Sequence, residues 1–430
     1  MAPSRTYEDI LQAMFKLGRF GIKLGLSTIR QILNNLNNPQ EGFSCVHVAG
    51  TNGKGSIASA LSTILNHSGY RVGLYTSPHL VRFNERIRIN NTPISDDAVT
   101  TSYTAVEHAQ GGTRQPTFFE YSTAMAFYEF GKQQVDWAII ETGMGGRLDA
   151  TNIITPALSV ISNISIEHKM YLGDTIEMIT REKGGIIKTN RPVVTGVKQK
   201  AAIALLKEIS GSKSAPFFRL GSDFHVRKSA DGTFSYFGIE NTWRGMQTAL
   251  LGNYQIDNAA LVLAACEVLN RNGVNISEQA MRSGLKQNIW PGRLEIVSTE
   301  PLVLLDGAHN FIAARNLAEF LWKNLSGRKI TLVIGVLDDK PYKSMLRCLL
   351  PLCSRVIIVL PKIDRALLPE KLFHVAKGLV EDIEIIPDVG AALARALETA
   401  SPEDAICIAG SLYVVGEAKA ALEKIKKIFP

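Results

Sequence analysis

The chain has 430 residues, a formal net charge of +7 at pH 7 and 20% charged residues. This length exceeds one ordinary hydrophobic core, so we expect two or three domains, and the composition is that of a globular protein rather than a disordered one. The positive charge suits anionic small ligands, although a solvated basic surface explains it more simply. Because the charge is spread along the chain without an arginine-rich run, we expect no nucleic-acid binding.

The cysteines and the amino terminus indicate an intracellular protein. The five cysteines form no Cys-x-x-Cys pair, which argues against a disulfide framework or a zinc site and predicts reduced thiols. The opening MAPSRTYEDILQ reaches acidic residues before an apolar stretch, unlike a signal peptide. Since no apolar run approaches the roughly 18 residues of a membrane span, we expect a cytoplasmic protein with no membrane partner.

Helical and strand patterns alternate over the first two thirds of the chain. Amphipathic patterns predict helices around 6–17 and 26–37, and the strand FSCVHVA at 43–49 leads directly into a glycine-rich turn. The remaining predictions in this part are helices at 55–69, 94–109, 118–133, 174–188, 254–271 and 277–286, strands at 71–76, 136–142 and 157–165, and a β-rich insertion at about 214–250.

A joint follows, because Pro291 and Gly292 break the helical pattern in NIWPGRLEIV. Five strand candidates come after it, separated by helical patterns as in a parallel sheet with crossover helices. They are LVLLD, ITLVIG, RVIIVL, IEIIP and AICIAG. We therefore predict an α/β protein with a larger domain at 1–290, built mainly on a parallel sheet, and a smaller Rossmann-like α/β domain at 296–430. The glycine-rich segment described next predicts that the larger domain is of the P-loop ATPase type.

The segment HVAGTNGKGSIASAL, residues 47–61, nearly matches a phosphate-binding loop but departs from its spacing. In the usual G-x-x-x-x-G-K-[ST] pattern a glycine would replace Val48, and the hydroxyl here arrives one residue late, as Ser56. A strand, a glycine-rich turn and a helix still place N–H groups and a helix dipole where phosphate oxygens bind. We predict that Lys54 contacts the terminal phosphates and that Ser56 serves Mg²⁺. The alternative is a glycine-rich turn that binds nothing.

Longer motifs help to decide between a nucleotide site and a turn that binds nothing. GTNGKGS is followed by GLYTSPHLVRFNERIRI, ETGMGGRLDATN, GDTIEMITREKGGIIK, GNYQIDNA, WPGRLE, LLDGAHN and GSLYVVGE. In this order they resemble the folylpolyglutamate synthase/dihydrofolate synthase family, part of the group of ATP-dependent ligases that includes the cell-wall Mur ligases. The resemblance covers almost the whole chain, and its motifs are long and specific.

The resemblance implies a ligase that joins a carboxylate to the amine of L-glutamate and releases ADP and phosphate. A carboxylate is a poor electrophile at neutral pH, so it would first take the γ-phosphoryl group, and glutamate would then attack the acyl phosphate. Catalysis then consists mostly of positioning and neutralising phosphate charge. The implied substrates are ATP, L-glutamate, dihydropteroate and reduced folates, and we expect a monomer. The ATP-binding residues implied are Thr51, Asn52, Gly53, Lys54, Gly55, Ser56, Asn258, Arg293, Asp306 and His309, with Gln255 near the adenine.

Two Mg²⁺ sites are implied as well, built from oxygen ligands that this ion prefers. Taken alone, Ser77 is equally well a turn residue before Pro78, and His168 a helix cap or a surface residue. The family usually has Asp before this histidine, where this chain has Glu167, so we leave Glu167 out of the predicted site. The metal-binding residues implied are Ser56, Ser77, Glu141, His168 and Lys183, and those implied to be catalytic are Lys54, Lys183 and His168.

Lys183 matches a lysine that the family carries as a carbamate. Carbon dioxide adds only to a neutral amine, so burial and nearby cations must lower the pKa of this lysine. The carbamate anion would hold the second Mg²⁺. Composition alone favours a plainer alternative, a surface helix lysine beside Glu182. Family lysines at this place are followed by Ala-Gly, whereas Gly184 and Gly185 follow here.

Further motifs address the pterin ring and the second domain. Asp149 and Ala150 in GGRLDATN resemble the form found in members that also accept dihydropteroate, which predicts a bifunctional enzyme. Thr117 and Phe119 would flank the ring, and FGIKLGLSTI at 20–29 resembles the segment that covers it. The alternative is that Asp149 caps a turn and that the phenylalanines are helix core.

Asp306 and His309 follow a strand at its carboxyl end, the ligand edge of α/β sheets, and closure of the two domains would gate catalysis.

Two other functions remain open at this point. A ligase of the same fold acting on a cell-wall precursor is disfavoured, since the phosphate loop begins by residue 50 without room for a separate uridine-nucleotide domain before it. A nucleotide-dependent switch that only binds or hydrolyses ATP is the alternative from another class. Folylpolyglutamate synthesis without dihydrofolate synthesis is the alternative within the family.

Overall fold

The structure is a computed structural model that describes residues 5–18, 23, 25–112 and 114–428. The chain divides into two compact units. Unit 1 comprises Met1–His79, Phe83–Ala249 and Gln255–Asn288, and unit 2 comprises Leu80–Arg82, Leu250–Tyr254 and Ile289–Pro430. Part of the predicted segment 20–29 lies outside the described residues.

Unit 1 is built on an eight-stranded sheet with the order β4-β3-β2-β5-β1-β6-β7-β8. Its six strands from β2 to β8 run parallel, and the β3–β4 hairpin is antiparallel at one edge. The buried strands β1, β5 and β6 are nearly continuous in apolar residues, as expected where helices cover both faces. The strands are β1 Ser44–Ala49, β2 Val72–Tyr75, β3 Ile87–Ile89, β4 Thr92–Pro93, β5 Trp137–Glu141, β6 Leu158–Ile161, β7 Val193–Thr195 and β8 Phe217–Arg219.

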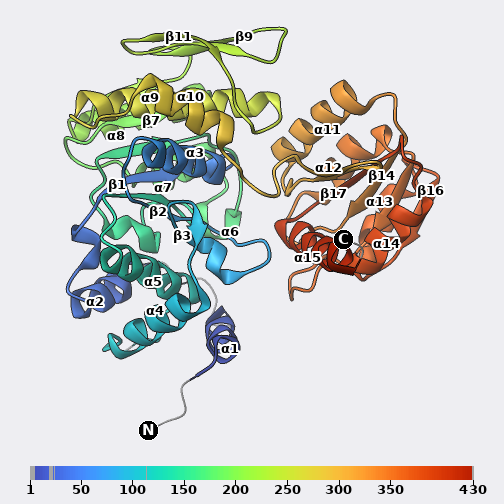
Figure 1. Cartoon of the computed structure of the whole chain (residues 1–430), viewed down its shortest axis with the longest axis horizontal. Coiled ribbons are helices and arrows are strands. Elements are labelled where there is room, and N and C mark those ends of the chain that lie inside the picture. The colour runs from blue at the N-terminus through green and yellow to red at the C-terminus, as the bar shows by residue number, and fades with distance from the viewer. Residues whose placement is uncertain (1–4, 19–22, 24, 113, 429–430) are drawn as a thin grey trace. The chain divides into compact units, whose positions relative to one another are not determined.

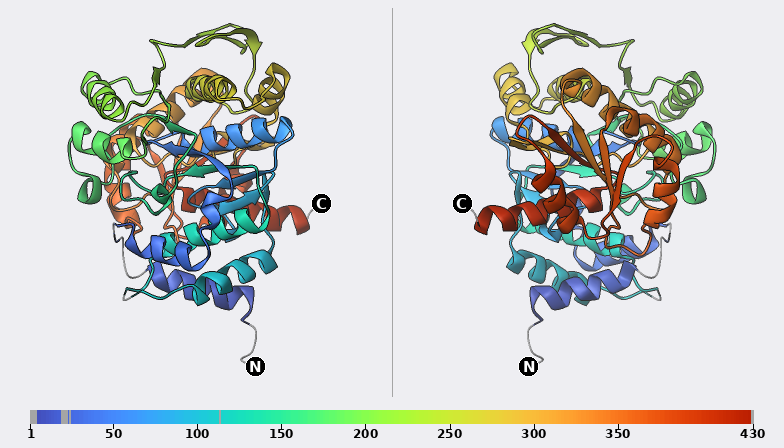
Figure 2. Two further views of the ribbon diagram at one scale, coloured as in Figure 1. Left: turned by 90° about the vertical axis from the view of Figure 1, so that its left-hand side faces the viewer. Right: turned by 90° about the vertical axis from the view of Figure 1, so that its right-hand side faces the viewer.

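Helices pack on the two faces of this sheet. One apolar core joins α1, α2, α4 and α5 to side chains of β1, β2 and β5, while α3 packs against β2, β5 and α10. A second core lies under α7 and α8. Figures 1 and 2 show α1, α2 and α4 at the end of unit 1 opposite the β9–β11 sheet. The helices are α1 Tyr7–Gly18, α2 Ser27–Asn35, α3 Lys54–His67, α4 Asp96–His108, α5 Phe118–Lys132, α6 Lys169–Leu172, α7 Ile176–Gly184, α8 Lys200–Ser212, α9 Asn253–Arg271 and α10 Glu278–Gln287.

The predicted β-rich insertion divides between two sheets. Its first strand, β8, joins the parallel sheet, and β9 His225–Lys228, β10 Phe234–Phe237 and β11 Thr242–Met246 form a separate antiparallel sheet. The buried carboxylate of Glu267 on α9 anchors this sheet, because it accepts hydrogen bonds from the Tyr236 hydroxyl and from the amides of Ile239 and Asn241. The sequence pattern did not separate β8 from its neighbours, since all four strands are short.

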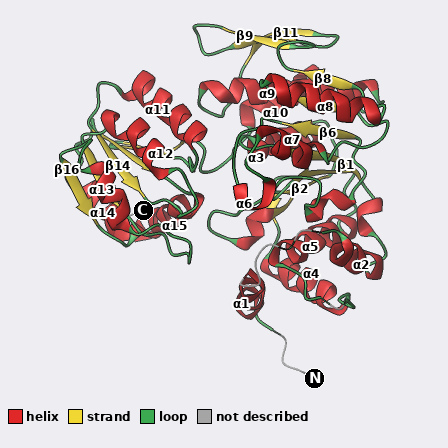
Figure 3. Cartoon of the chain, turned by 180° about the vertical axis from the view of Figure 1, so that it is seen from behind, coloured by secondary structure: helices red, strands yellow, loops and turns green. Residues whose placement is uncertain are grey.

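Unit 2 is an α/β domain on a six-stranded sheet with the order β12-β13-β17-β14-β15-β16. All neighbours are parallel except the edge pair β12–β13. Alternate residues of β17 point to opposite faces, so Cys407 joins the core under α11, α12 and α13, whereas Ile406 and Ile408 join the core under α14 and α15. Figure 3 shows helices on both faces of this sheet. The elements are β12 Glu295–Thr299, β13 Leu302–Leu305, α11 Phe311–Leu325, β14 Ile330–Ile334, α12 Tyr342–Leu349, β15 Arg355–Ile358, α13 Pro369–Ala376, β16 Asp382–Ile385, α14 Val389–Thr399, β17 Ala405–Ala409 and α15 Leu412–Ile428.

The predicted α/β class and the parallel sheets are confirmed, with differences at the element ends. The helix predicted to 188 ends at Gly184, because two consecutive glycines interrupt it. The helix predicted from 94 begins at Asp96, where the Ser95 side chain accepts a hydrogen bond from the Ala98 amide. All five cysteines are free. Within the described part of the chain, no helix is long and apolar enough to cross a membrane.

Candidate active site

The phosphate loop connects β1 to α3 through two glycines with positive φ. Gly50 has φ +148° and Gly53 has φ +85°, and a Cβ atom on them would lie 1.9 Å from the Ser162 Oγ and 2.7 Å from the Asn258 Oδ1. Only glycine therefore fits at either position. Because α3 begins at Lys54, the amides of its first turn are not used by intrahelical hydrogen bonds and are available to an anion.

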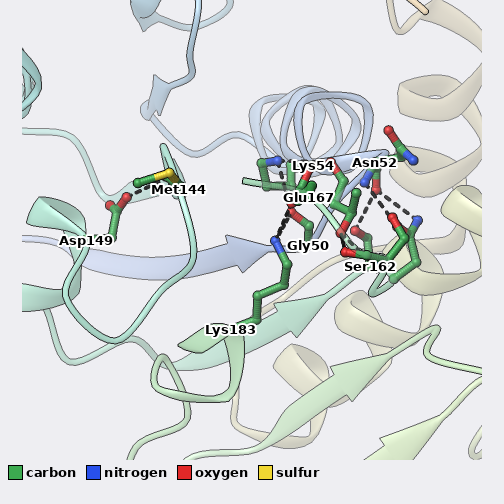
Figure 4. A network of polar contacts seen from close by, with 11 residues as sticks. Gly50, Asn52, Lys54, Met144, Asp149, Ser162, Glu167 and Lys183 are labelled. Carbon is green, nitrogen blue, oxygen red and sulfur yellow. Dashed lines mark hydrogen bonds and ion pairs between the residues drawn. The ribbon is translucent and has the colours of Figure 1, made fainter. Parts of the chain in front are cut away.

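The segment that follows β6 braces this loop, as Figure 4 shows. The Asn52 amide donates to the Asn163 Oδ1 at 3.0 Å, and the Asn163 Nδ2 donates back to the Asn52 carbonyl at 3.0 Å. The Ser162 hydroxyl donates to the same carbonyl at 2.6 Å, and the Thr51 amide donates to the Asn163 carbonyl at 2.9 Å. Because the Thr51 and Asn52 amides are already engaged, a phosphate would have to bind to other amides, such as those at the start of α3.

Two lysines converge on the carbonyl of Gly50. The Lys54 Nζ donates to it at 3.0 Å and to the Thr51 carbonyl at 3.2 Å. The Lys183 Nζ donates to it at 2.8 Å and forms an ion pair of 2.7 Å with the Glu167 Oε1 (Figure 4). Only 1% of the Lys183 side chain is exposed, so the reading of Lys183 as a surface helix lysine is wrong.

This cluster perturbs the protonation of both partners. Burial by itself would raise the pKa of Glu167, but Lys183 and then Lys54 lower that pKa to about 2. Burial lowers the pKa of Lys183, Glu167 opposes that change, and Lys54 adds to it. Burial and a neighbouring cation are the two conditions named above for a lysine that reacts with carbon dioxide. The structure also shows that Glu167, which the sequence analysis left out, belongs to the cluster.

The Ser56 hydroxyl, which stands one residue later than in the usual phosphate-loop pattern, has a partner on α9. Ser56 is buried in the first turn of α3, and the Gln255 Nε2 donates to its Oγ at 3.3 Å. The Asn258 Nδ2 donates to the Gln255 Oε1 at 2.8 Å. Gly55 lies beside Ser56 in the same turn. The residues predicted to bind ATP in unit 1 are therefore gathered at the loop and on α9.

Two of the predicted metal ligands, Glu141 and Ser77, lie at the carboxyl ends of the neighbouring strands β5 and β2. Glu141 ends β5 and is 4% exposed, and its Oε2 accepts a hydrogen bond of 3.2 Å from the Ser77 amide after β2. His168 precedes α6 with a left-handed φ of 47° and is half-buried. No three His, Cys, Asp or Glu side chains converge as a metal cluster within the described ranges. The oxygen donors present still suit Mg²⁺, which is commonly held by one or two carboxylates and by substrate phosphates.

Asp149 caps a turn in this structure. Its Oδ1 accepts hydrogen bonds from the Thr151 amide at 3.0 Å and the Thr151 hydroxyl at 2.5 Å, and its Oδ2 accepts one from the Met144 amide at 2.8 Å. The side chain is buried, and burial raises its pKa while these hydrogen bonds oppose the rise. Ala150 follows it in a short 3-10 helix, η3 Ala150–Ile153. Both oxygens of Asp149 therefore already accept hydrogen bonds within the turn. Direct pairing of Asp149 with a pterin stays a prediction.

Thr117 and Phe119 lie at the start of α5. Thr117 forms a capping box with Glu120, whose carboxylate also pairs with Arg114. Phe119 is half-buried, its ring centroid lies 6.0 Å from that of Tyr75, and it touches the site of Gly143. Phe119 therefore lies next to the turn held by Asp149, whereas Thr117 is engaged as a helix cap.

The predicted residues of unit 2 form a local group of their own. The buried carboxylate of Asp306 accepts hydrogen bonds from the amides of Leu294 and Ala308, both at 2.9 Å. The Arg293 Nη1 donates to the Gly307 carbonyl at 3.2 Å, and the same carbonyl lies 2.8 Å from the His309 Nδ1. This loop follows β13 at its carboxyl end, as predicted.

The sequence analysis did not single out several residues that contact the predicted site. Ser162 and Asn163 brace the phosphate loop, and Glu167 pairs with Lys183. The available signal was their place directly after the strand ALSVI, at the carboxyl edge of a parallel sheet. The sequence analysis also did not name His47 on β1, whose Nε2 contacts the Thr151 hydroxyl of the Asp149 turn. Its position inside an apolar strand gave no indication of this partner.

Comparison with known proteins identifies the family. Residues 48–266 match the Mur ligase middle domain, and residues 292–412 match the Mur ligase glutamate ligase domain. A dihydrofolate synthase/folylpolyglutamate synthase of Bacillus subtilis is 36% identical over 97% of this chain and 99% of the relative. The chain belongs to the folylpolyglutamate synthase/dihydrofolate synthase family of Mur ligases.

Other members of this family also match over most of the chain. A folylpolyglutamate synthase of Lacticaseibacillus casei is 37% identical over 92% of this chain and 93% of the relative. E. coli FolC in complex with DHPP and ADP has a TM-score of 0.90, with 30% identity over 98% of this chain and 100% of that one. The bifunctional folylpolyglutamate synthase/dihydrofolate synthase of Yersinia pestis, complexed with AMPPNP and a Mn ion, has a TM-score of 0.88, with 30% identity over 98% of each chain.

Proposed function

We propose that this protein is an ATP-dependent ligase that adds L-glutamate to dihydropteroate and to the glutamyl tail of reduced folates. The reaction passes through an acyl phosphate and releases ADP and phosphate. Full-length similarity to enzymes named for both activities supports this function. The observation that carries it is the loop at Gly50, where two lysines and the first turn of α3 meet at the carboxyl edge of the sheet.

The chain's own residues account for the phosphoryl-transfer half of the reaction. Lys54 would exchange the Gly50 and Thr51 carbonyls for oxygens of the terminal phosphates, and the amides at the start of α3 would hold the phosphates from the other side. The bracing by Asn163 keeps these donors in fixed positions. Charge on the transferred phosphoryl group is then stabilised by groups that need no reorganisation during the reaction.

Mg²⁺ would be held by the Ser56 hydroxyl, the Glu141 carboxylate and the segment of Ser77, whose oxygens and burial fit a hard cation. Bound there, it would supply neutralising charge to the phosphates. A second ion would require the carbamate of Lys183, together with His168. We propose that the neutral form of Lys183 becomes accessible when the ion pair with Glu167 opens, because burial already disfavours the ammonium.

In unit 2 we propose that Arg293 reaches the phosphates and that Asp306 and His309 contact the ribose and the incoming glutamate. The two functional domains would then be 1–290 for ATP and folate and 296–430 for the glutamate half, with closure gating the reaction. We further propose that the enzyme acts as a monomer in the cytoplasm, without nucleic-acid or membrane partners.

One purified-protein assay tests the function. ADP release is measured with ATP and Mg²⁺, with and without L-glutamate, using dihydropteroate or tetrahydrofolate as the acceptor. The proposal predicts glutamate-dependent ADP release with both acceptors and a product heavier by one glutamyl residue. Turnover of tetrahydrofolate alone would leave folylpolyglutamate synthesis as the only activity, as the name of the L. casei relative suggests. ADP release that does not depend on glutamate or on the pterin acceptor would instead support an ATP-hydrolysing switch.

A further inference from the structure

A chain of hydrogen bonds links the central strand β1 to the turn that Asp149 holds. The His47 Nε2 lies 2.8 Å from the Thr151 Oγ1, and the Thr151 hydroxyl lies 2.5 Å from the Asp149 Oδ1. The other oxygen of Asp149 accepts the Met144 amide at 2.8 Å, as Figure 4 shows. His47 has no exposed surface, and it lies three residues before Gly50 of the phosphate loop.

The direction of this chain follows from counting protons. An ionised Asp149 only accepts, so Thr151 gives its single hydroxyl proton to the carboxylate. The Thr151 oxygen must then accept from His47, which makes His47 the neutral tautomer protonated on Nε2. The reverse direction would leave a buried N–H on Nδ1, and this nitrogen has no hydrogen-bond partner among the described residues. The low pKa of His47, about 3 because of burial and then Lys188, agrees with a neutral ring.

The unpartnered Nδ1 argues against a purely structural role for the ring. A buried acceptor without a donor costs stability, and an apolar side chain of similar size would avoid that cost. The only polar contact that the described structure gives the imidazole is the one to Thr151. What the imidazole contributes is therefore the orientation of Thr151, and through it the orientation of Asp149.

We propose that His47 is a positioning residue for the pterin-binding turn 143–151 and acts through Thr151 on Asp149. This inference rests on the proposed function and on the sequence-based prediction that Asp149 and Ala150 bind the pterin. Since β1 also carries the phosphate loop, one strand fixes the binding elements for both substrates. His47 touches neither substrate in this arrangement and acts only on the shape of the turn.

The test compares donors at position 47. His47→Gln can present an N–H close to the place of Nε2, whereas His47→Leu removes the donor with little change in volume. We expect His47→Leu to raise the KM for dihydropteroate about fivefold, the value of one ordinary hydrogen bond. The KM for ATP and the thermal midpoint should stay near those of the wild type, and His47→Gln should restore most of the pterin affinity.

A second pair of variants and a second readout keep the test decisive. Thr151→Val breaks the same chain from its other side, and Thr151→Ser keeps the hydroxyl. Hydrogen exchange of the Met144 amide reports the turn directly, so it should accelerate in His47→Leu and in Thr151→Val. Equal changes in the KM values for ATP and dihydropteroate, or unchanged exchange at Met144 in both variants, would overturn the proposal. A wild type that turns over neither folate would refute the proposed function, and exchange at Met144 would then decide the role of His47 by itself.

Discussion

Asp149 has two competing roles, contact with the pterin or support of the turn, and replacing it separates them. In the structure its carboxylate accepts two hydrogen bonds from Thr151 and one from the Met144 amide. Asp149→Ala removes both acceptor oxygens and with them three hydrogen bonds, which leaves the buried Thr151 amide and the part-buried Met144 amide without these partners. Asp149→Asn keeps one acceptor oxygen and turns an NH₂ group toward an amide that also donates.

The decrease in the free energy of unfolding of both variants can be estimated from these contacts. Each buried amide left without an acceptor costs about 1–3 kcal/mol, and the lost cap of the 3-10 helix adds about 1 kcal/mol. Against this, the variant no longer buries a charge, whose cost shows in the raised pKa of Asp149. We therefore expect Asp149→Ala to lower the free energy of unfolding by about 2–4 kcal/mol, and Asp149→Asn by about 1–3 kcal/mol.

The assay combines urea denaturation with turnover of both acceptors. If Asp149 supports the turn, dihydropteroate and tetrahydrofolate lose affinity together, and stability falls in both variants. If Asp149 pairs with dihydropteroate itself, Asp149→Ala loses that activity while glutamylation of tetrahydrofolate survives. An Asp149→Ala protein within about 0.5 kcal/mol of the wild type, the range of neutral surface changes, would refute the reasoning from the hydrogen bonds.

Three further measurements address the loop, the lysine cluster and the buried histidine. Lys54→Ala should abolish amide synthesis and leave the protein folded, because its charge serves phosphates, while Lys323→Ala on the surface of unit 2 should keep full turnover; an active Lys54→Ala enzyme would contradict the loop assignment. Lys183→Ala should lose most activity and regain part of it with short-chain carboxylic acids that replace the carbamate, and full activity without additives would argue against that role. Because of His47, the free energy of unfolding should fall by about 1.4 kcal/mol per pH unit between pH ~6.5 and pH ~3. In this range the unfolded ring binds a proton, whereas the folded ring, with its pKa of about 3, stays neutral. His47→Gln should lack this share of the slope, and identical pH profiles for the two proteins would show that His47 is not the group responsible.

The short-range patterns determined the secondary elements and the place of the phosphate loop. Apolar strands bounded by glycine and proline identified β1, β5 and the parallel strands of unit 2, because burial on both faces leaves a continuous apolar run. Strand pairing was not readable: the sequence did not show that β8 belongs to the large sheet, or that Leu80–Arg82 packs with unit 2. These outcomes depend on contacts between residues far apart in the chain, which no local period encodes.

The residues of the candidate site likewise fall into those that the sequence predicted and those that only the tertiary structure showed. The chain's own letters, GTNGKGS and the motifs after it, determined which residues to examine and which family to expect, because glycine at positive φ and lysine beside it are local requirements. Only the tertiary structure brought Glu167 to Lys183 and His47 to Thr151, since the two residues of each pair belong to different segments of the chain. A buried charge or imidazole is stable only with a partner, and which residue becomes that partner is decided by the packing of the sheet.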